Sequence, residues 1–289
     1  MNGMRLLITG GSSYLGRYLT RLAVADFEVC YTYFQNDPLG LPQGEWLDVR
    51  EETAVSRLVH TFRPHVIIHT IGSNRCDDMY NVICRGTAHV THAARAINAR
   101  LIHISTDALF DGRHAPYTES ASPSPLHEYG RAKAAAETIV SQHPDHVIIR
   151  TSLIYGLHEM DHSTAWIARA LQAGKPVVLF DNQRRNPVWV ETLARACLEL
   201  ATTPYVGILN VAGRQVLTRA EFGLRLLDWW QIAARETLQI GKADGEKWPL
   251  DCELDLQRAT AVLQTPLYGV DEVLQRFTPP ECTRKTADS

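Results

Sequence analysis

Short apolar runs alternate with longer amphipathic segments through the first half of the chain. The apolar runs predict strands at residues 4–9, 27–34, 65–70, 99–105 and 146–150. Between them, apolar residues recur at helical spacing in residues 14–25, 51–62, 77–98 and 129–143. Nearly continuous Val, Ile and Leu in short strands is typical of a parallel sheet that is buried on both faces. The alternation therefore predicts an α/β fold with a doubly wound parallel sheet.

The regular alternation weakens after Arg150. Polar loops such as "DNQRRNP" and "GKADGEKWPLD" appear, and residues 219–234 form the clearest helical pattern in this half. We expect a first domain at residues 1–155 and a smaller lobe mainly at 156–289, with about 177–203 returning to the core of the first domain. A ligand crevice would then lie between the two, at the carboxyl ends of the strands.

Composition and charge exclude several classes of protein. The 289 residues carry a formal net charge of -3, with 29 basic and 32 acidic residues spread along the chain, so no basic stripe for nucleic acid is expected. The 6 cysteines form no C-x-x-C pair and the 12 histidines show no metal-ligand spacing, so no metal is expected. Because no signal-peptide core or membrane-length apolar stretch occurs, we expect a cytoplasmic protein without a membrane partner.

A glycine-rich loop follows the first predicted strand and opens the first predicted helix. Gly10, Gly11 and Gly16 lie in "ITGGSSYLG", where free backbone N–H groups at a helix start would bind the pyrophosphate of a dinucleotide in a Rossmann domain. Ser13 occupies the place of a middle glycine, and a simple glycine-rich turn is the alternative. The second strand ends in aromatic residues instead of the acid that selects NAD, which favours NADP over NAD.

Lys133 follows Tyr129 by four positions in the sequence, so both project from one face of a predicted helix. Thr106 stands at the carboxyl end of the preceding strand. Hydride addition to a carbonyl builds negative charge on its oxygen, and the site must stabilise that oxygen and supply a proton. A phenol beside an ammonium, with a hydroxyl near the same oxygen, meets that need. The alternative is structural: a packed tyrosine, a solvated lysine and a capping threonine.

The motifs "ITGGSSYLG", "LDVR", "ISTDALFDG", "HEYGRAK", "IIRTSLIYG" and "NPVWVETLA" together resemble the extended short-chain dehydrogenase/reductase family. Within that family the chain resembles the dTDP-4-dehydrorhamnose reductase group. The resemblance implies Thr106, Tyr129 and Lys133 as the catalytic set, with Tyr129 and Lys133 also touching the cofactor. It further implies cofactor contacts from the glycine loop and from the ends of two strands: Gly10, Ser12, Ser13, Tyr14, Leu15, Gly16, Asp48, Val49, Ile71, Gly72 and Ser73.

Substrate contacts are implied for Thr106, Asp107 and Ser152, and the adjacent Arg184 and Arg185 are candidates for binding a diphosphate. A solvated loop is the alternative for these two arginines.

Two departures from the group concern the substrate pocket. Ala108 and Leu153 stand where rhamnose-pathway enzymes usually have Tyr and Trp, so the sugar itself is left open. The Asp-Glu pair of related dehydratases is also missing, because Asp107 is followed by Ala108.

These patterns predict an NAD(P)H-dependent reductase of a keto group on a nucleotide-linked sugar. One alternative is a cofactor-binding regulatory subunit, like that of methionine adenosyltransferase, which resembles the same group. Another is a nucleotide-sugar epimerase. A homodimer is possible through the helices predicted at 77–98 and 129–143.

Overall fold

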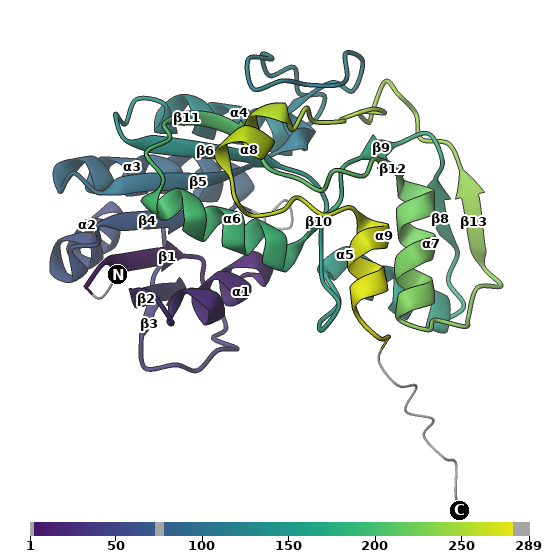
Figure 1. Ribbon diagram of the computed structural model, residues 1–289, viewed down its shortest axis with the longest axis horizontal. Helices are drawn as coiled ribbons and strands as arrows, with labels where there is room; N and C mark the ends of the chain where they lie inside the picture. Colours follow the sequence, from purple (N-terminus) through teal and green to yellow (C-terminus); the bar gives the residue numbers. More distant parts are fainter. Residues whose placement is uncertain (1–2, 73–77, 280–289) are drawn as a thin grey trace, which may run out of the picture.

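The computed structural model describes residues 3–72 and 78–279, and a parallel sheet lies at its centre (Figure 1). Seven strands form this sheet in the order β11-β6-β5-β4-β1-β2-β3, and every pairing is parallel. The strands are β1 (Arg5–Thr9), β2 (Glu28–Tyr33), β3 (Gly44–Trp46), β4 (Val66–His69), β5 (Arg100–Thr106), β6 (His146–Thr151) and β11 (Gly207–Asn210). The order reverses between β1 and β4, and a doubly wound sheet is expected to bind its ligand at the carboxyl ends of the strands at this point. The predicted fold is confirmed.

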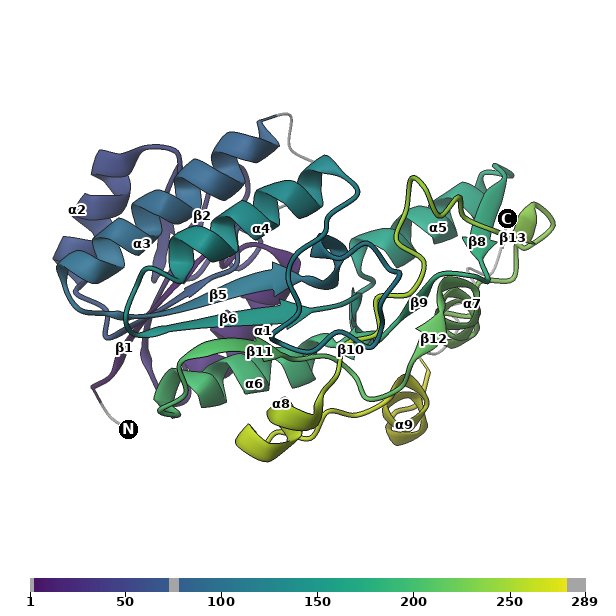
Figure 2. The ribbon, with the colours of Figure 1, turned by 90° about the horizontal axis from the view of Figure 1, so that it is seen from above.

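Helices cover both faces of the sheet (Figure 2). One face carries α1 (Tyr14–Ala23) and α6 (Val190–Thr202), which contact each other. The other face carries α2 (Glu52–Phe62), α3 (Gly86–Ala96) with the π-helical η1 (Asn81–Arg85) before it, and α4 (Glu128–Val140). Because both faces are covered, the residues of β1, β2, β4, β5 and β6 are almost all buried, which explains the near-continuous apolar sequences of these strands.

The remaining elements form a smaller lobe beyond the carboxyl ends of the strands (Figure 1). Three two-stranded pairings, β10–β7, β12–β9 and β13–β8, hold the lobe and its connections. Its elements and connections are β7 (Ile154–Tyr155), α5 (His162–Gln172), β8 (Val177–Phe180), β9 (Arg184–Arg185), β10 (Val188–Trp189), β12 (Leu217–Thr218), α7 (Arg219–Trp229), β13 (Leu238–Gly241) and α9 (Val270–Arg276). Within 177–203, β8 pairs with β13 in the lobe, whereas α6 packs on the central sheet.

Two strands of the central sheet escaped the sequence analysis. β3 has only three residues, two of them exposed, at the sheet edge, so it shows neither a buried run nor alternation. β11 has four residues and forms the opposite edge, where α8 (Gln257–Val262) packs against it. Short edge strands carry too few apolar residues to stand out by periodicity.

A buried ion pair fixes α4 over the sheet. Nη2 of Arg150, on β6, lies 2.8 Å from Oε2 of Glu137 on α4, and both side chains are almost fully buried. Glu137 also accepts a hydrogen bond of 2.5 Å from the Ser105 hydroxyl on β5. The second arm of Arg150 donates to the backbone oxygens of Glu119 and Ala121. Because α4 carries Tyr129 and Lys133, this pair sets their height above the strand ends.

None of the helices within the described residues is long and apolar enough to cross a membrane.

Candidate active site

The glycine loop brings the start of α1 against the end of β1. Gly10 has a φ of 77°, which an L side chain rarely adopts. A Cβ on Gly16 would lie 2.2 Å from the Gly10 backbone oxygen, so only glycine permits this approach. Ser13 has a φ of -67° and caps α1 by accepting a hydrogen bond of 3.1 Å from the Gly16 N–H. The loop therefore presents a helix N-terminus at the crevice, where it can bind a phosphate.

The other loop residues expected at the pyrophosphate are placed differently from one another. The Ser12 N–H donates to the Thr32 oxygen at 3.4 Å, and the Leu15 side chain is buried in the core, so only its backbone can face a ligand. The Tyr14 hydroxyl donates to the backbone oxygen of Glu159 at 2.7 Å. Tyr14 thus ties the start of α1 to the loop between β7 and α5.

The adenine end of the expected cofactor site contains an arginine that the sequence analysis missed. Arg50 follows "LDV", and its guanidinium lies 5.5 Å from the centre of the Phe34 ring, just beyond the end of β2. It pairs with Asp48, at 2.7 Å, and with Asp78, at 3.0 Å. These hydrogen bonds lower the pKa of Asp48 below its usual value. Because β2 and β3 are parallel neighbours, the residues that follow the two strands lie at the same edge of the sheet. A prediction of β3 beside β2 would therefore have placed Arg50 near Phe34.

Three more residues of the predicted cofactor set lie near α3 and α4. Val49 is buried, and a Cβ on Gly86 would lie 2.6 Å from it, so α3 packs closely here. Gly72 has a φ of 144°, and a Cβ there would lie 3.4 Å from Nζ of Lys133. Ile71, which precedes it, packs against the core under α2 and α3. Ser73 lies outside the described residues.

Thr106, Asp107 and Tyr129 come together where β5 ends. The Thr106 hydroxyl oxygen accepts a hydrogen bond of 3.1 Å from the Ala108 N–H, and the same hydroxyl lowers the pKa of the Tyr129 phenol. Asp107 is buried and accepts a hydrogen bond of 2.6 Å from the Ser152 hydroxyl. Burial and the Asp107 charge raise the pKa of Tyr129 to about 12. The phenol is therefore protonated at neutral pH.

Lys133 lies one turn beyond Tyr129 on α4 and is fully buried. Its ammonium donates to the Ile104 backbone oxygen at 2.6 Å and lies 3.1 Å from Nε2 of His103. Burial lowers the pKa of Lys133 to about 8, against the opposing effects of Glu137 and Cys84. The ammonium turns toward β5, and the pKa of Tyr129 responds to burial, to the Asp107 charge and to the Thr106 hydroxyl.

A histidine that the sequence analysis missed orients Tyr129. His127 is the N-cap of α4 and accepts a hydrogen bond of 3.1 Å from the Gly130 N–H through Nδ1. Its ring stacks on Tyr129, with 6.2 Å between the centroids. The position just before the predicted helix is the signal that could have identified His127 as a cap.

Arg184 and Arg185 are adjacent in sequence but point to different partners. Arg184 is half-exposed and pairs with Asp251 at 2.8 Å and with Glu253 at 3.3 Å. Arg185 is buried; it donates to the backbone oxygens of Pro249 and Leu250, and its Nε lies 3.5 Å from Oδ2 of Asp107. Neither guanidinium is free, so the structure does not support the expectation that this pair offers an open diphosphate site.

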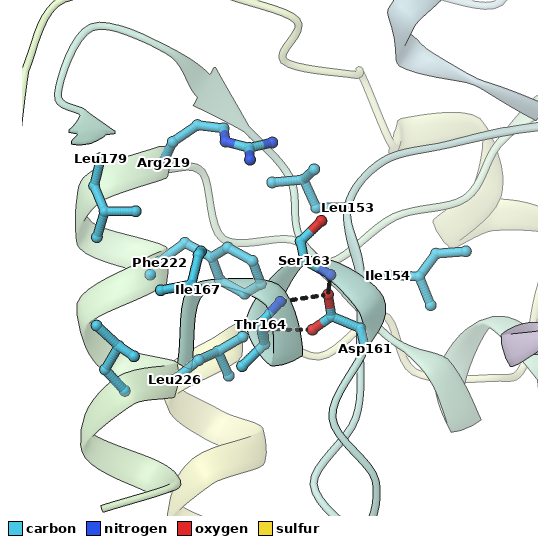
Figure 3. A pocket seen from close by; sticks show the side chains of 12 residues that line it. Leu153, Ile154, Asp161, Ser163, Thr164, Ile167, Leu179, Arg219, Phe222 and Leu226 are labelled. Carbon is cyan, nitrogen blue, oxygen red and sulfur yellow. Dashed lines mark hydrogen bonds between the residues drawn. The ribbon is translucent and has the colours of Figure 1, made fainter. Parts of the chain in front are cut away.

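A pocket opens in the lobe next to these residues (Figure 3). It lies between α5, β8 and α7 and has a cavity volume of about 90 Å³. Leu153, which follows Ser152, lines it, and Arg219 extends from the start of α7 toward Leu153 (Figure 3). Sequence analysis did not identify Arg219, because nothing in "LTRAEF" separates it from an ordinary solvated helix residue.

No group of three or more His, Cys, Asp or Glu side chains within residues 3–72 and 78–279 is arranged to hold a metal ion.

Comparison with known proteins gives two different activities at similar identity. Methionine adenosyltransferase 2 subunit beta of Rattus norvegicus is 27% identical, over 94% of this chain and 88% of the relative. The dTDP-4-dehydrorhamnose reductase of Mycobacterium tuberculosis is 29% identical, over 74% of this chain and 72% of the relative. Both relatives are therefore similar over most of their length.

The solved structure of a hypothetical dTDP-4-dehydrorhamnose reductase from Sulfolobus tokodaii superimposes with a TM-score of 0.81 at 29% identity, covering 94% of this chain and 99% of that one. The resemblance seen in the sequence is thereby confirmed. The family model of the RmlD substrate binding domain matches residues 4–278. Because that match spans nearly the whole chain, the protein belongs to the RmlD substrate binding domain family.

Proposed function

We propose that this dTDP-4-dehydrorhamnose reductase-like protein reduces a keto group on a nucleotide-linked sugar, with NADPH or NADH as the hydride donor. One observation carries the proposal: Thr106 and Tyr129 meet at the end of β5, while Lys133 reaches the crevice beside Gly72. These three residues lie where the sheet order reverses, next to the glycine loop. The proposal includes the cytoplasmic location and the homodimer expected from the sequence.

The residues around the crevice fit a dinucleotide. The Gly10–Gly16 contact leaves no room for a Cβ in the loop, and the capped start of α1 points backbone N–H groups into the crevice. In this proposal the loop holds the pyrophosphate, and Asp48 and Val49 lie near the adenine. Tyr129 and Lys133 contact the nicotinamide ribose. The bound nicotinamide would supply the hydride.

The chain's own residues handle the charge and the proton. Tyr129 donates its proton to the carbonyl oxygen as that oxygen gains negative charge, and its raised pKa keeps the proton in place until then. Thr106 hydrogen-bonds the same oxygen and fixes its position. The Ser152–Asp107 hydrogen bond holds the turn after Thr106 in place. Lys133 supplies a positive charge below pH 8 that opposes the charge left on the tyrosine.

Two features favour NADPH over NADH in this proposal. The end of β2 carries aromatic residues, Tyr33 and Phe34, and no carboxylate that would bind the ribose hydroxyls of NADH. Arg50 lies over the Phe34 ring at the same edge, and its guanidinium can pair with a 2′-phosphate if that phosphate replaces Asp48 or the half-exposed Asp78 as its partner.

A second candidate is a cofactor-binding regulatory subunit, favoured by the 27% identity to methionine adenosyltransferase 2 subunit beta. The two candidates differ in turnover. Purified protein should oxidise NADPH when mixed with a 4-keto nucleotide sugar, and the Tyr129→Phe variant should bind NADPH but not oxidise it. Cofactor binding without NADPH oxidation across a panel of keto-sugar nucleotides would support the regulatory subunit instead. Tightly bound NAD that co-purifies with the protein would point to an epimerase.

A further inference from the structure

The pocket in the lobe has an apolar floor and one guanidinium, that of Arg219. Its floor is made of side chains from α5, β8 and α7: Ile167, Leu179, Phe222, Leu226 and Leu227. Figure 3 shows Arg219 at the opposite side of the pocket, extending toward Leu153 and Ser163. The pocket thus combines an apolar surface with a guanidinium, a lining suited to a ligand that has both a ring and a negative charge.

The acidic group in this pocket is already engaged. Oδ1 of Asp161 accepts hydrogen bonds from the N–H groups of Ser163, at 2.8 Å, and Thr164, at 3.1 Å. Its other oxygen accepts from the Thr164 hydroxyl at 2.5 Å. Asp161 therefore caps α5 and does not bond to Arg219, although its charge still acts on Arg219 from a distance.

Arg219 itself has no side-chain partner within the described part of the chain. Its backbone N–H donates to the Gln183 oxygen at 2.8 Å, but its guanidinium makes no hydrogen bond or ion pair with a described residue. Burial and the nearby Arg185 charge lower its pKa, while the Asp107 and Asp161 charges act in the opposite direction. An arginine that is partly shielded from water without a carboxylate or carbonyl partner lacks the compensation that such a charge needs.

The unpaired cation lies close to the reacting centre. Leu153 lines the pocket and directly follows Ser152, whose hydroxyl donates to Asp107 at 2.6 Å. Asp107 in turn follows Thr106 in the chain, so one wall of the pocket belongs to the segment that bonds to the turn after Thr106. A substrate whose keto group reaches Thr106 would extend its remaining part past Leu153 toward Arg219.

We propose that Arg219 binds the diphosphate of the substrate, and that the apolar floor of this pocket receives the ring next to it. A guanidinium bonds two phosphate oxygens at once, and sugars linked to a nucleoside diphosphate carry that group. The inference rests on the proposed function for the orientation of the substrate. It replaces Arg184 and Arg185 in the diphosphate role, because Arg184 is paired with carboxylates and Arg185 holds the 249–250 backbone and Asp107.

The test measures binding, so it does not depend on turnover. The full chain is first saturated with NADP⁺ to fill the cofactor loop. It is then titrated calorimetrically with dTDP, UDP and GDP, and in separate titrations with the corresponding uncharged nucleosides. At least one diphosphate should bind more tightly than its nucleoside. In Arg219→Gln that diphosphate should lose about 10- to 100-fold in affinity, while its nucleoside changes little. Arg184→Gln is the matched control and should retain the diphosphate affinity. Both variants should keep the melting temperature of the parent protein.

The outcomes separate this inference from the proposed function. If no diphosphate binds better than its nucleoside, or if Arg219→Gln keeps the full diphosphate affinity, the inference is overturned. A diphosphate preference that disappears in Arg219→Gln supports it, even in a protein that never oxidises NADPH. If Arg219 instead binds a sugar carboxylate, Arg219→Gln should bind the diphosphate as tightly as the parent does but should bind a UDP-uronic acid more weakly. That result also overturns the diphosphate assignment.

Discussion

The ammonium of Lys133 lies 3.1 Å from Nε2 of His103, in a fully buried part of the structure. An ammonium has no lone pair, so Nε2 must accept this hydrogen bond and the imidazole must be neutral. Burial and the charges of Lys133 and His69 keep the pKa of His103 well below its usual value, which agrees with a neutral ring. His103 thus supplies one of the two hydrogen-bond acceptors that hold Lys133.

We expect the loss of His103 to shift the pH profile of the reaction. The pKa of Lys133 is about 8, so kcat should fall as the pH rises through 8 and the ammonium loses its proton. In His103→Leu the ammonium loses an acceptor, its charged form is less stable, and the midpoint should fall by about one pH unit. The other groups that act on Lys133, Glu137 and Cys84, remain in place.

Two further variants isolate this effect. His103→Gln keeps an acceptor oxygen and should restore the midpoint. His143 is also buried but bonds to the Ala99 oxygen at 2.8 Å, just before the start of β5. His143→Leu should lower stability without moving the profile. A midpoint in His103→Leu equal to that of the parent would show that His103 does not control Lys133.

Protonation of His69 should make the protein less stable in acid. Its two ring nitrogens bond to the hydroxyls of Thr9, at 2.7 Å, and Thr87, at 3.2 Å, and burial lowers its pKa from 6.5 to about 3. Below pH 6.5 the His69 imidazole binds a proton in the unfolded state, whereas in the folded state it does so only near pH 3. The free energy of unfolding should therefore fall by about 1.4 kcal/mol per pH unit from this residue alone.

Urea unfolding at pH 6.5, 5.5 and 4.5 measures this slope. Depressed carboxylate pKa values add to it, so the comparison is between the parent and His69→Asn. The free energy of unfolding of the variant should fall less steeply with decreasing pH, and the difference in slope should be about the contribution of one histidine. Equal slopes for the two proteins would mean that His69 is protonated in the folded state.

The buried pair of Glu137 and Arg150 should matter far more than an exposed pair. Glu137→Gln leaves Arg150 buried with a neutral partner and should lower the free energy of unfolding by about 3–5 kcal/mol. Asp251→Asn breaks the half-exposed Arg184 pair and should lower it by about 0.2–1 kcal/mol. Chemical denaturation of both variants at neutral pH gives the comparison. Similar losses for the two would contradict the structural role assigned to the buried pair.

Arg50 should set the preference between cofactors. If its guanidinium pairs with the 2′-phosphate of NADPH, Arg50→Ala should raise the KM for NADPH about 10-fold or more. The KM for NADH, which lacks that phosphate, should change little. Steady-state kinetics with both cofactors on one sugar substrate measure this. An equal rise for both cofactors would indicate a general loss of structure around Asp48 and Asp78, which Arg50 bridges.

The sequence predicted the long buried strands and the meeting of Thr106 with Tyr129, because both follow from local patterns. β3 and β11 were missed because short edge strands leave no periodic signal. Arg50 and Arg219 were missed for another reason. Each gains its meaning from segments far away in the chain: Phe34 for Arg50, and Leu153 with α5 for Arg219. The inward turn of Lys133 likewise depends on His103, which an adjacent strand contributes.

The most direct test of the central claim follows a deuteride from cofactor to sugar. NADPH labelled with deuterium at C4, in each of the two stereochemical forms, is incubated with the protein and a 4-keto nucleotide sugar, and the product is analysed by mass spectrometry and NMR. The account predicts that one form delivers its deuterium to the carbon of the new alcohol, and that Tyr129→Phe slows this at least about 100-fold with NADPH still bound. Intact labelled NADPH and unchanged sugar across the panel would contradict it.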